Sequence, residues 1–348
     1  MRQLNVIQTS TGPARRPSGP GGDAGDGLPN RRAALAHGGD RASAGAAPSP
    51  EEWPKRKPDW MKVRAPGGDE YRRVKDLMRG MELNSVCEEA HCPNIGECWE
   101  KGTATFLIMG DTCTRNCPYC AIGHGRPEEL DLDEPRRVAE AIAELRLNHC
   151  VITSVDRDDL PDGGARIFAD TIRQIRSRLP DCSVEVLTPD FQGDADAVRT
   201  VLEARPAIFN HNMETVERLH GTARPGGRYR RSLDVLRTAR EAEGEALVKT
   251  GIMLGLGEEA DDVRAFMDDA LEAGVQILTL GQYLRPSEDH LPIDRYVTPA
   301  EFDRWKEIGE SLGFLHVESG PLVRSSYHAG EQVKELRSKA GTTVPAAS

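Results

Sequence analysis

Short apolar runs recur along the middle of the chain, and each predicts a β-strand. Six such runs lie at residues 105–109, 150–153, 184–187, 207–210, 247–254 and 275–280. Within a run the apolar residues follow one another and do not alternate with polar ones. This pattern is typical of strands that are covered on both faces, as in a parallel sheet between helices.

Amphipathic helical patterns separate these runs. Pro135 suits the first position of a helix, and an apolar stripe follows it. Three stripes stand out: Val138, Ala141, Ile142 and Leu145; Phe168, Ile172, Ile175 and Leu179; and Val263, Phe266, Met267, Ala270 and Leu271. Six strands that alternate with helices predict parallel pairing and right-handed crossovers.

Six strand–helix units are fewer than the eight of a closed barrel. We therefore expect an α/β fold, a partial (β/α)6 TIM-like barrel over residues 105–290. Residues 53–104 and 291–337 flank it as N- and C-terminal extensions. In such folds the chemistry lies beyond the carboxyl ends of the strands.

Composition limits the folded region. Residues 1–52 are rich in Gly, Ala, Pro, Ser and Arg and poor in large apolar residues, so we expect a disordered N-terminal extension. Residues 338–348 are expected to form a loose tail.

Charge and hydropathy exclude several function classes. The net charge of −11 argues against a nucleic-acid partner, which would need a basic face. No apolar run approaches the roughly 18 residues of a membrane span. The N-terminus lacks an apolar signal core, which predicts a cytoplasmic location. Six Arg among the first 50 residues leave an organelle transit peptide as the alternative, but three Asp there speak against it.

Six of the eight cysteines lie between Cys87 and Cys120. They form two groups of three, in CEEAHCPNIGEC at residues 87–98 and in CTRNCPYC at residues 113–120. Crowding of this kind in a large chain without a secretion signal is typical of metal binding and not of a disulfide framework. Cys150 and Cys182 lie in apolar surroundings, so we expect both to be buried.

The spacing C-x3-C-x2-C at residues 113–120 provides three thiolates and no fourth. Three thiolates can hold three irons of a four-iron cluster and leave the fourth iron open to another ligand. The motif follows the first predicted strand, so it lies at the end where chemistry is expected. Zinc, with His91 or His124, is the competing interpretation, although C-x3-C fits zinc knuckles poorly.

A C-x3-C-x2-C motif after the first strand of a partial barrel resembles the radical S-adenosylmethionine (SAM) superfamily. Within it, CEEAHCPNIGECW at residues 87–99 resembles the auxiliary-cluster motif of the lipoyl synthase family. The resemblance covers about residues 53–335. It continues through ITSVDRDDLPDGGA (152–165), VEVLTPDF (184–191), FNHNMETV (209–216), KTGIMLGLGE (249–258), TLGQYLRPS (279–287) and GPLVRSSYHAG (320–330).

This resemblance implies radical insertion of two sulfur atoms at carbons 6 and 8 of an octanoyl chain attached to a protein lysine. It implies SAM and two 4Fe–4S clusters as cofactors, with the auxiliary cluster as the sulfur donor. A methylthiotransferase with two clusters is the alternative enzyme. An electron carrier or a zinc-stabilised binding module is the non-catalytic alternative.

The resemblance also implies roles for individual residues. Cys113, Cys117 and Cys120 would hold the SAM cluster. The auxiliary cluster would be held by Cys87, Cys92 and Cys98, with Ser326 as fourth ligand. The implied SAM contacts are Tyr119, Thr153, Ser154, Asn212, Glu214, Gln282, Tyr283 and Leu284.

The residues taken alone leave alternatives open at several of these positions. Asn212 and Glu214 fit the start of a helix equally well. Ser325 and Ser326 fit a turn or a cap. The acidic run VDRDDLPDGG at residues 155–164 suggests a divalent cation, but its spacing is not that of an EF-hand.

The partners that the resemblance implies follow from the reaction. The substrates would be octanoylated lipoyl domains of 2-oxoacid dehydrogenase complexes or the glycine-cleavage H protein. Ferredoxin or flavodoxin would supply electrons, and an iron–sulfur carrier would rebuild the auxiliary cluster after turnover.

Overall fold

The computed structural model describes residues 57–63, 65–101 and 104–326. The predicted disordered extension at residues 1–52 and the predicted tail at residues 338–348 lie outside these ranges.

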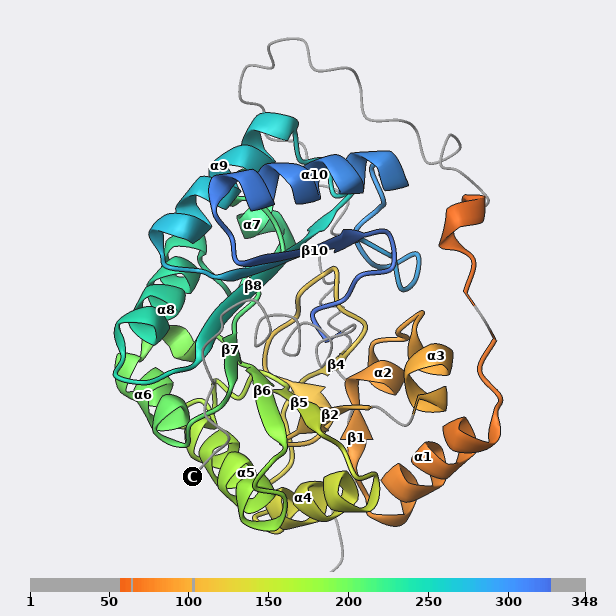
Figure 1. Cartoon of the computed structure of the whole chain (residues 1–348), viewed down its shortest axis with the longest axis vertical. Coiled ribbons are helices and arrows are strands. Elements are labelled where there is room, and N and C mark those ends of the chain that lie inside the picture. Colours follow the sequence, from red (N-terminus) through yellow and green to blue (C-terminus); the bar gives the residue numbers. More distant parts are fainter. Residues whose placement is uncertain (1–56, 64, 102–103, 327–348) are drawn as a thin grey trace, which may run out of the picture. The chain divides into compact units, whose positions relative to one another are not determined.

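An open, curved sheet forms the centre of the fold (Figure 1). In the described part of the chain, seven strands run parallel and β1 pairs with β2 in the antiparallel direction. In spatial order the strands are β1 (Asn84–Ser85), β2 (Thr105–Ile108), β5 (His149–Ser154), β6 (Ser183–Leu187), β7 (Ile208–Asn210), β8 (Leu247–Leu254), β9 (Ile277–Gln282) and β10 (His316–Gly320). The six predicted strands are all present, which confirms the partial α/β barrel.

Helices connect successive strands and cover the outer face of the sheet (Figure 1). They are α4 (Glu134–Glu144), α5 (Ala165–Arg178), α6 (Ala195–Glu203), α7 (Glu217–Ala223), α8 (Tyr229–Glu241), α9 (Ala260–Glu272) and α10 (Pro299–Leu312). The three predicted apolar stripes lie in or directly after α4, α5 and α9, and Pro135 lies in the first turn of α4 as expected. Among the described helices, none has the length and apolar character needed to cross a membrane.

Several short elements precede or follow β2, and one more, η3, follows β6. They are η2 (Asp59–Met61), α1 (Asp69–Gly80), α2 (Val86–Glu89), α3 (Ile95–Glu100), β3 (Thr112–Cys113), β4 (Gly123–His124) and η3 (Phe191–Gly193). The first group of cysteines lies on α2, on α3 and between them. The second group lies on β3 and on the loop between β3 and β4, which pair with each other in a small separate sheet.

Strand β10 is the main feature of the sheet that the apolar pattern did not predict. It pairs in parallel with β9 from His316 to Gly320. Its sequence, HVESG, contains one large aliphatic residue, Val317. Strand β10 lies at the edge of the sheet, where a long apolar run is not required. The sheet therefore extends one parallel strand into the predicted C-terminal extension.

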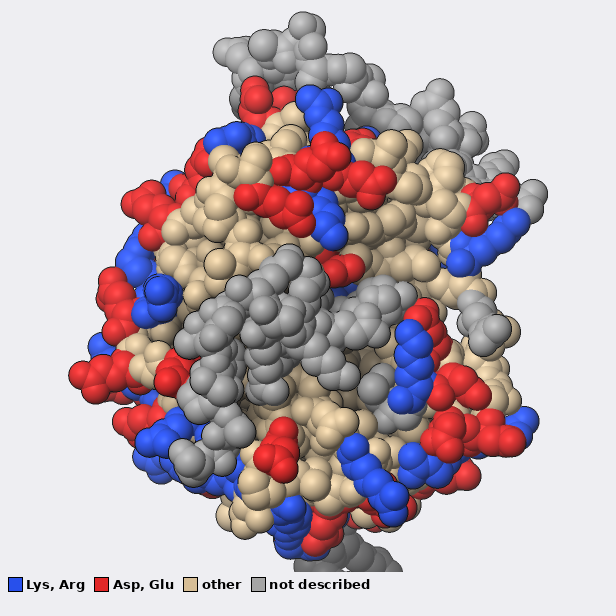
Figure 2. Space-filling model, viewed as in Figure 1, with Lys and Arg blue, Asp and Glu red and all other residues tan. Residues whose placement is uncertain are grey.

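Charged side chains of both signs alternate over the helical rim on the face shown in Figure 2. Many of them pair within one helix, as Arg136 of α4 does with Asp133 and Glu140. Such exposed pairs contribute about 0–1 kcal/mol each, so they keep the surface hydrated more than they stabilise the fold.

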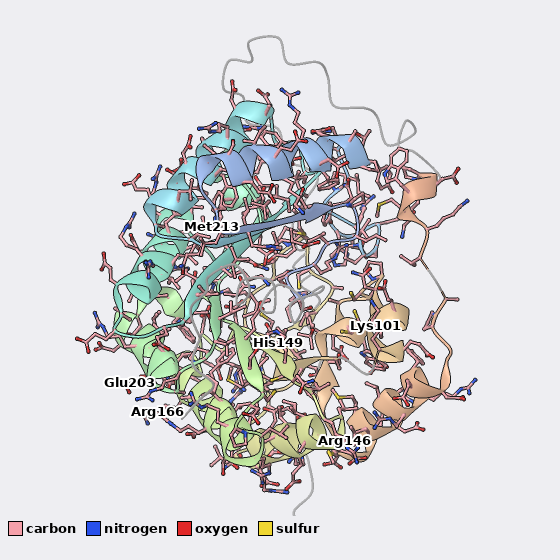
Figure 3. The ribbon with its side chains drawn as sticks, in the orientation of Figure 1. Lys101, Arg146, His149, Arg166, Glu203 and Met213 are labelled. Carbon is pink, nitrogen blue, oxygen red and sulfur yellow. The ribbon has the colours of Figure 1, made fainter. Side chains whose placement is uncertain are left out.

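The inner face of the sheet carries buried polar side chains. Glu185 of β6 lies on the face opposite to Val184 and Val186, because neighbouring strand residues alternate in direction. Neither Glu185 nor Lys249 of β8 has exposed side-chain surface, and Lys249 Nζ lies 3.0 Å from Glu185 Oε1. His149, at the start of β5 and labelled in Figure 3, places its Nε2 3.8 Å from Glu185 Oε2. A polar layer thus lines the inside of the barrel.

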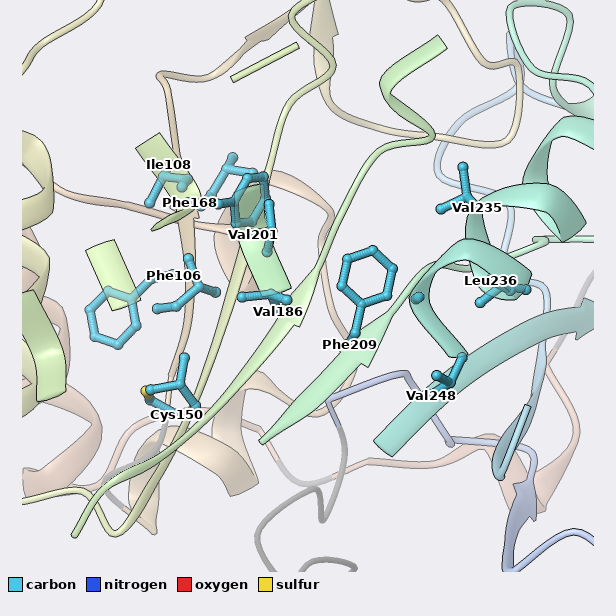
Figure 4. Packing of buried hydrophobic residues seen from close by; sticks show 14 of the residues in the cluster. Phe106, Ile108, Cys150, Phe168, Val186, Val201, Phe209, Val235, Leu236 and Val248 are labelled. Carbon is cyan, nitrogen blue, oxygen red and sulfur yellow. The ribbon is translucent and has the colours of Figure 1, made fainter. Parts of the chain in front are cut away.

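The main apolar core lies between the sheet and the helices (Figure 4). Strand residues such as Phe106, Val186 and Phe209 meet helical residues such as Phe168 and Leu236 there. Cys150 and Cys182 are buried in this core, 2% and 6% exposed, as their apolar surroundings predicted.

Removal of a large core side chain should therefore lower the stability of the whole barrel. Phe168 of α5 has no exposed surface. Phe168→Ala should reduce the free energy of unfolding by about 3–5 kcal/mol, through lost burial and a residual cavity. Leu132→Ala, at a position that is 78% exposed, should change it by less than about 0.5 kcal/mol. Chemical denaturation followed by circular dichroism measures both, and equal losses would contradict this description of the core.

Candidate functional site

The C-x3-C-x2-C loop begins just beyond the carboxyl end of β2. Cys113 lies on β3, Cys117 and Cys120 follow in the loop, and all three are partly buried. The Cys113 sulfur accepts hydrogen bonds from the backbone N–H groups of Arg115 (3.4 Å) and Asp156 (3.3 Å). Donors of this kind orient metal-bound thiolates and tune their basicity.

The thiols of this loop lie in surroundings that disfavour the anionic form. Burial raises the pKa of Cys113 to about 11 and the pKa of Cys117 and Cys120 to about 12. Cys113 and Cys120 are close enough to Cys117 that their charges would raise its pKa further. A cationic metal centre would supply the positive charge that three neighbouring thiolates require.

Arg115, inside the cysteine motif, anchors the loop to the sheet. Its guanidinium is 6% exposed and lies 2.6 Å from Asp158 Oδ2, 2.7 Å from Asp190 Oδ1 and 3.4 Å from Asp156 Oδ1. Thr114 adds two hydrogen bonds to the Asp156 carbonyl, one from its N–H (2.9 Å) and one from its hydroxyl (2.8 Å). The loop therefore has a fixed path before any cofactor binds.

These contacts give the acidic run at residues 155–164 a role. Asp156 and Asp158 pair with Arg115, and Asp159 pairs with Arg157 at 2.8 Å. Among the described residues, no three His, Cys, Asp or Glu side chains are placed to hold a single metal ion. The run thus serves to hold the cysteine loop. Sequence reasoning missed Arg115. The only signal for it was an arginine within the cysteine motif together with a dense acidic run after the next predicted strand.

Glu214 and Asn212 follow β7 and lie beside the cysteine loop. Glu214 has a φ of +68°, and its backbone bridges to β8 through a 3.0 Å hydrogen bond to the Gly251 carbonyl. Helix α7 begins later, with Val216 as its N-cap. The helix-start alternative for Asn212 and Glu214 is therefore wrong. A non-glycine residue held at positive φ is strained, and such residues are frequent at functional sites.

Five buried side-chain oxygens have no hydrogen-bond partner among the described residues, and three of them belong to Asp156, Asn210 and Thr215. The other two are the Ser154 hydroxyl, at the end of β5, and the Asn212 side-chain carbonyl. An unsatisfied buried polar atom costs about 1–3 kcal/mol, so a polar ligand would be favoured here. Gly251 of β8 lies next to Asn212, and a Cβ at this position would come within 3.4 Å of Asn212 Oδ1. Both oxygens belong to predicted SAM contacts.

Other predicted SAM contacts use their polar groups within the protein. The Thr153 hydroxyl donates to the Leu187 carbonyl at 3.0 Å. The Gln282 amide bonds only to backbone groups in the described chain, and the Tyr283 hydroxyl donates to a backbone carbonyl at 2.8 Å. Leu284 is partly buried. The structure therefore does not bring these polar groups to a ligand, and the contacts of these four residues with SAM stay predictions.

Tyr119 lies within the cysteine loop beside a buried arginine. Its phenol is partly buried, and burial keeps its pKa well above the usual value, with Glu214 and Cys117 adding to the shift. Arg224, at the end of α7, donates to the Asn212 carbonyl at 2.8 Å and lowers the pKa of Cys117 by its charge. Sequence reasoning missed Arg224, since no motif marks it. Tyr119, Arg224 and Glu214 thus lie close enough to one another for their charges to interact.

The second cysteine group lies on α2, on α3 and on the turn between them. Ser85 caps α2 by accepting a hydrogen bond from the Cys87 N–H at 3.2 Å. The Cys92 N–H donates to the Cys87 carbonyl at 3.0 Å. Burial raises the pKa of Cys92 to about 11 and of Cys98 to about 12, and Cys87 raises both further. The three sulfurs therefore share one desolvated neighbourhood.

Residues 321–326, which we call the C-terminal segment, lie against this cysteine group. Asn94 donates to the Leu322 carbonyl at 2.7 Å. A Cβ on Gly281 of β9 would collide with the Val323 carbonyl, so only glycine permits this close approach. Burial lowers the pKa of the Arg324 guanidinium. The nearby Cys92 and Glu214 oppose this shift. Arg324 thus lies near Cys92 of the second group and near Glu214, and Ser326 follows it.

An open parallel sheet with a three-cysteine loop beyond its first barrel strand defines a radical SAM enzyme. The model of the radical SAM superfamily matches residues 107–270, and the model of the N-terminal domain of lipoyl synthase of the radical SAM family matches residues 42–92. The chain belongs to the lipoyl synthase family of radical SAM enzymes.

Individual relatives support this assignment. Lipoyl synthase of Rubrobacter xylanophilus is 59% identical over 81% of this chain and 88% of its own length. Lipoyl synthase of Koribacter versatilis is 55% identical over 82% of this chain and 93% of its own length. Lipoyl synthase of Methylococcus capsulatus is 57% identical over 80% of this chain and 87% of its own length. The solved structure of methylornithine synthase aligns with a TM-score of 0.49 at 13% identity, covering 79% of this chain and 94% of that chain. That likeness is too weak to add to the sequence relationship.

Loss of the Arg115 anchor should affect one cysteine group and spare the other. Arg115→Gln would leave the fully buried Asp190 carboxylate with Arg231 as its remaining partner, so the loss of stability should be smaller than the about 3–5 kcal/mol of a fully broken buried pair. We expect the iron content after anaerobic reconstitution to fall to about half. Arg173→Gln, which breaks an exposed pair with Asp170, should retain full iron content. An iron and sulfide assay measures both variants, and full iron content in Arg115→Gln would contradict the anchoring role.

Proposed function

We propose that this chain inserts two sulfur atoms at carbons 6 and 8 of an octanoyl chain carried on a protein lysine, which gives the lipoyl group. The observation that carries this proposal is the presence of two separate cysteine triads, each one ligand short of four, one in the loop after β2 and one on the α2–α3 segment after β1. Membership of the lipoyl synthase family supports the same reaction. Unactivated C–H bonds resist acid–base chemistry, so two such centres suit a radical reaction.

The donor set of the first triad fits a four-iron cluster with one open iron. Cys113, Cys117 and Cys120 would hold three irons, and SAM would bind at the fourth. When bound, the cluster and SAM supply one electron and the 5′-deoxyadenosyl group, and the resulting radical removes a hydrogen atom from the substrate. The three thiols need not converge on one point for this cluster, because each would bind a different iron.

The protein's own side chains would bind and shield SAM. Ser154 and Asn212 each offer a buried oxygen that lacks a hydrogen-bond partner in the described chain. Tyr119 offers an aromatic face beside the cysteine loop, suited to adenine. Arg224 and Glu214 place opposite charges around the same space, matching a ligand that carries both signs. Partial burial of these groups limits water near a reactive radical.

The second triad would hold the auxiliary cluster, with Ser326 as its fourth ligand. Cys87, Cys92 and Cys98 supply thiolates, and the C-terminal segment runs beside them. A serine oxygen is a harder ligand than a thiolate and suits iron in such a cluster less well. Ser326 would therefore release its iron more readily than the cysteines, which would make cluster sulfide available as the sulfur source.

The partners follow from the proposed reaction. An octanoylated lipoyl domain or the glycine-cleavage H protein would present its lysine at the carboxyl end of the sheet. Ferredoxin or flavodoxin would reduce the first cluster. An iron–sulfur carrier would restore the auxiliary cluster, since its sulfide is consumed.

An anaerobic assay tests the proposed function. Reconstituted protein, SAM, a strong reductant and a peptide with octanoyl-lysine should yield a peptide with two added sulfurs, together with 5′-deoxyadenosine. Mass spectrometry detects both products. Deoxyadenosine without a thiolated peptide would exclude this substrate. If neither product forms although the clusters are intact, radical catalysis by this chain would be excluded.

Single cysteine replacements should separate the two centres. Cys117→Ala removes one of three thiolates at the SAM site, so we expect SAM cleavage to fall below detection while the auxiliary cluster is retained. Cys92→Ala should retain SAM cleavage and stop sulfur insertion. Cys150→Ala, a buried cysteine outside both triads, should retain both activities. Product analysis distinguishes the three variants, and sulfur insertion by Cys92→Ala would show that the auxiliary triad is not the sulfur source.

A further inference from the structure

The ion pair between Lys249 and Glu185 lies inside the barrel and plays no part in the site described so far. Both side chains are fully buried, and Lys249 Nζ lies 3.0 Å from Glu185 Oε1 and 3.3 Å from Oε2. Asn210 of β7 donates to the same carboxylate at 3.3 Å, and His149 Nε2 is 3.8 Å from it. These groups fix the carboxylate, which in turn directs the ammonium group.

Stability of the fold gives no sufficient reason for this pair. Burial of two charges costs desolvation, and an apolar pair of similar volume often stabilises a protein as well or better. The barrel interior accepts apolar side chains, since Ile208, Ile277 and Leu247 form a small cluster of their own there. A buried lysine at this place therefore points to a contact that only a donor can make.

That contact is with the C-terminal segment. Lys249 Nζ donates to the Ser325 carbonyl at 2.6 Å, across 76 positions of sequence. An ammonium group has three donors, so one of them can bond Ser325 while the others face Glu185. The Ser325 carbonyl belongs to the peptide group that leads into Ser326. Because a peptide group is planar, a fixed carbonyl also fixes the direction of the Ser326 N–H and Cα.

The other anchors of the segment lie further from Ser326. Asn94 bonds the Leu322 carbonyl, and Gly281 allows the close approach of Val323. These contacts place the start of the segment, whereas the contact of Lys249 lies at the residue before Ser326.

We propose that Lys249 is a positioning residue that holds the Ser325–Ser326 peptide and so directs the Ser326 hydroxyl toward the second cysteine triad. This role rests on the proposed function, because it takes Ser326 as a ligand of the auxiliary cluster. Lys249 bonds the backbone and leaves the hydroxyl free. The segment therefore stays anchored when the hydroxyl releases iron, and the same residue is available when the cluster is rebuilt.

Three variants test this role. Lys249→Met alone leaves Glu185 buried without its partner, so a loss of folding would be ambiguous. The double variant Lys249→Met/Glu185→Gln removes both charges and keeps similar volumes, which restores a neutral interior without restoring the donor. Lys62→Met, at a lysine whose side chain is 69% exposed, is the control for loss of a lysine.

The first readout is hydrogen–deuterium exchange of residues 320–326 in the cluster-free protein, which does not depend on catalysis. The double variant should exchange about tenfold faster or more in this peptide, since a hydrogen bond from a charged donor is worth at least that factor. The exchange of β5–β8 peptides should be unchanged, and Lys62→Met should match the wild type throughout. Equal protection of residues 320–326 in the double variant would overturn the contact itself.

The second readout is the ratio of sulfur insertion to SAM cleavage in the reconstituted protein. The double variant should cleave SAM within about twofold of the wild type and insert sulfur about tenfold less. Mössbauer spectra should show an altered ligand environment at one iron of the auxiliary cluster. If the double variant inserts sulfur at the wild-type rate and gives wild-type spectra, Lys249 would only form a structural ion pair. If the wild type itself gives no thiolated product, the proposed function would be rejected. The exchange result would still show whether the contact of Lys249 with Ser325 holds the segment.

Discussion

The pairing of the Arg115 guanidinium with three carboxylates is the interaction on which the catalytic end of this molecule depends. The cysteine loop has little apolar surface with which to hold itself in place, and its thiols are destabilised as anions by burial. Arg115 ties the loop to Asp190, which follows β6, and to the acidic run that follows β5. Two strands of the sheet thus fix the path of the three-cysteine loop, as a preorganised metal site would require.

The same logic extends to the second cysteine group, which lies outside the barrel proper. The chain returns from β10 and lays the C-terminal segment beside α2 and α3, where Asn94 bonds the Leu322 carbonyl. Gly281 permits the approach, Arg324 lies near Cys92 and Glu214, and Lys249 reaches the segment from inside the barrel. The second cysteine group and the C-terminal segment are thereby tied to the same sheet as the first group.

The sequence allowed the barrel and the family to be predicted because these depend on local pattern and motif spacing, and the cysteine ligands stay predictions. Apolar runs marked six strands, whereas β10, with Val317 as its one large aliphatic residue, left no such mark. Arg115 was missed because its role depends on Asp190, 75 positions away. Thr153 and Gln282 were chosen by motif, but their polar groups bond within the protein. Long-range polar pairing is the part of the site that local reasoning cannot supply.

We propose that two four-iron clusters occupy the two distinct cysteine triads of this chain. Anomalous X-ray diffraction at the iron absorption edge, from crystals of anaerobically reconstituted protein, would locate the iron. We expect two iron sites per chain, one beside Cys113, Cys117 and Cys120 and one beside the second triad with Ser326 at its remaining iron. A single iron site, or anomalous signal at the zinc edge in either triad, would contradict it.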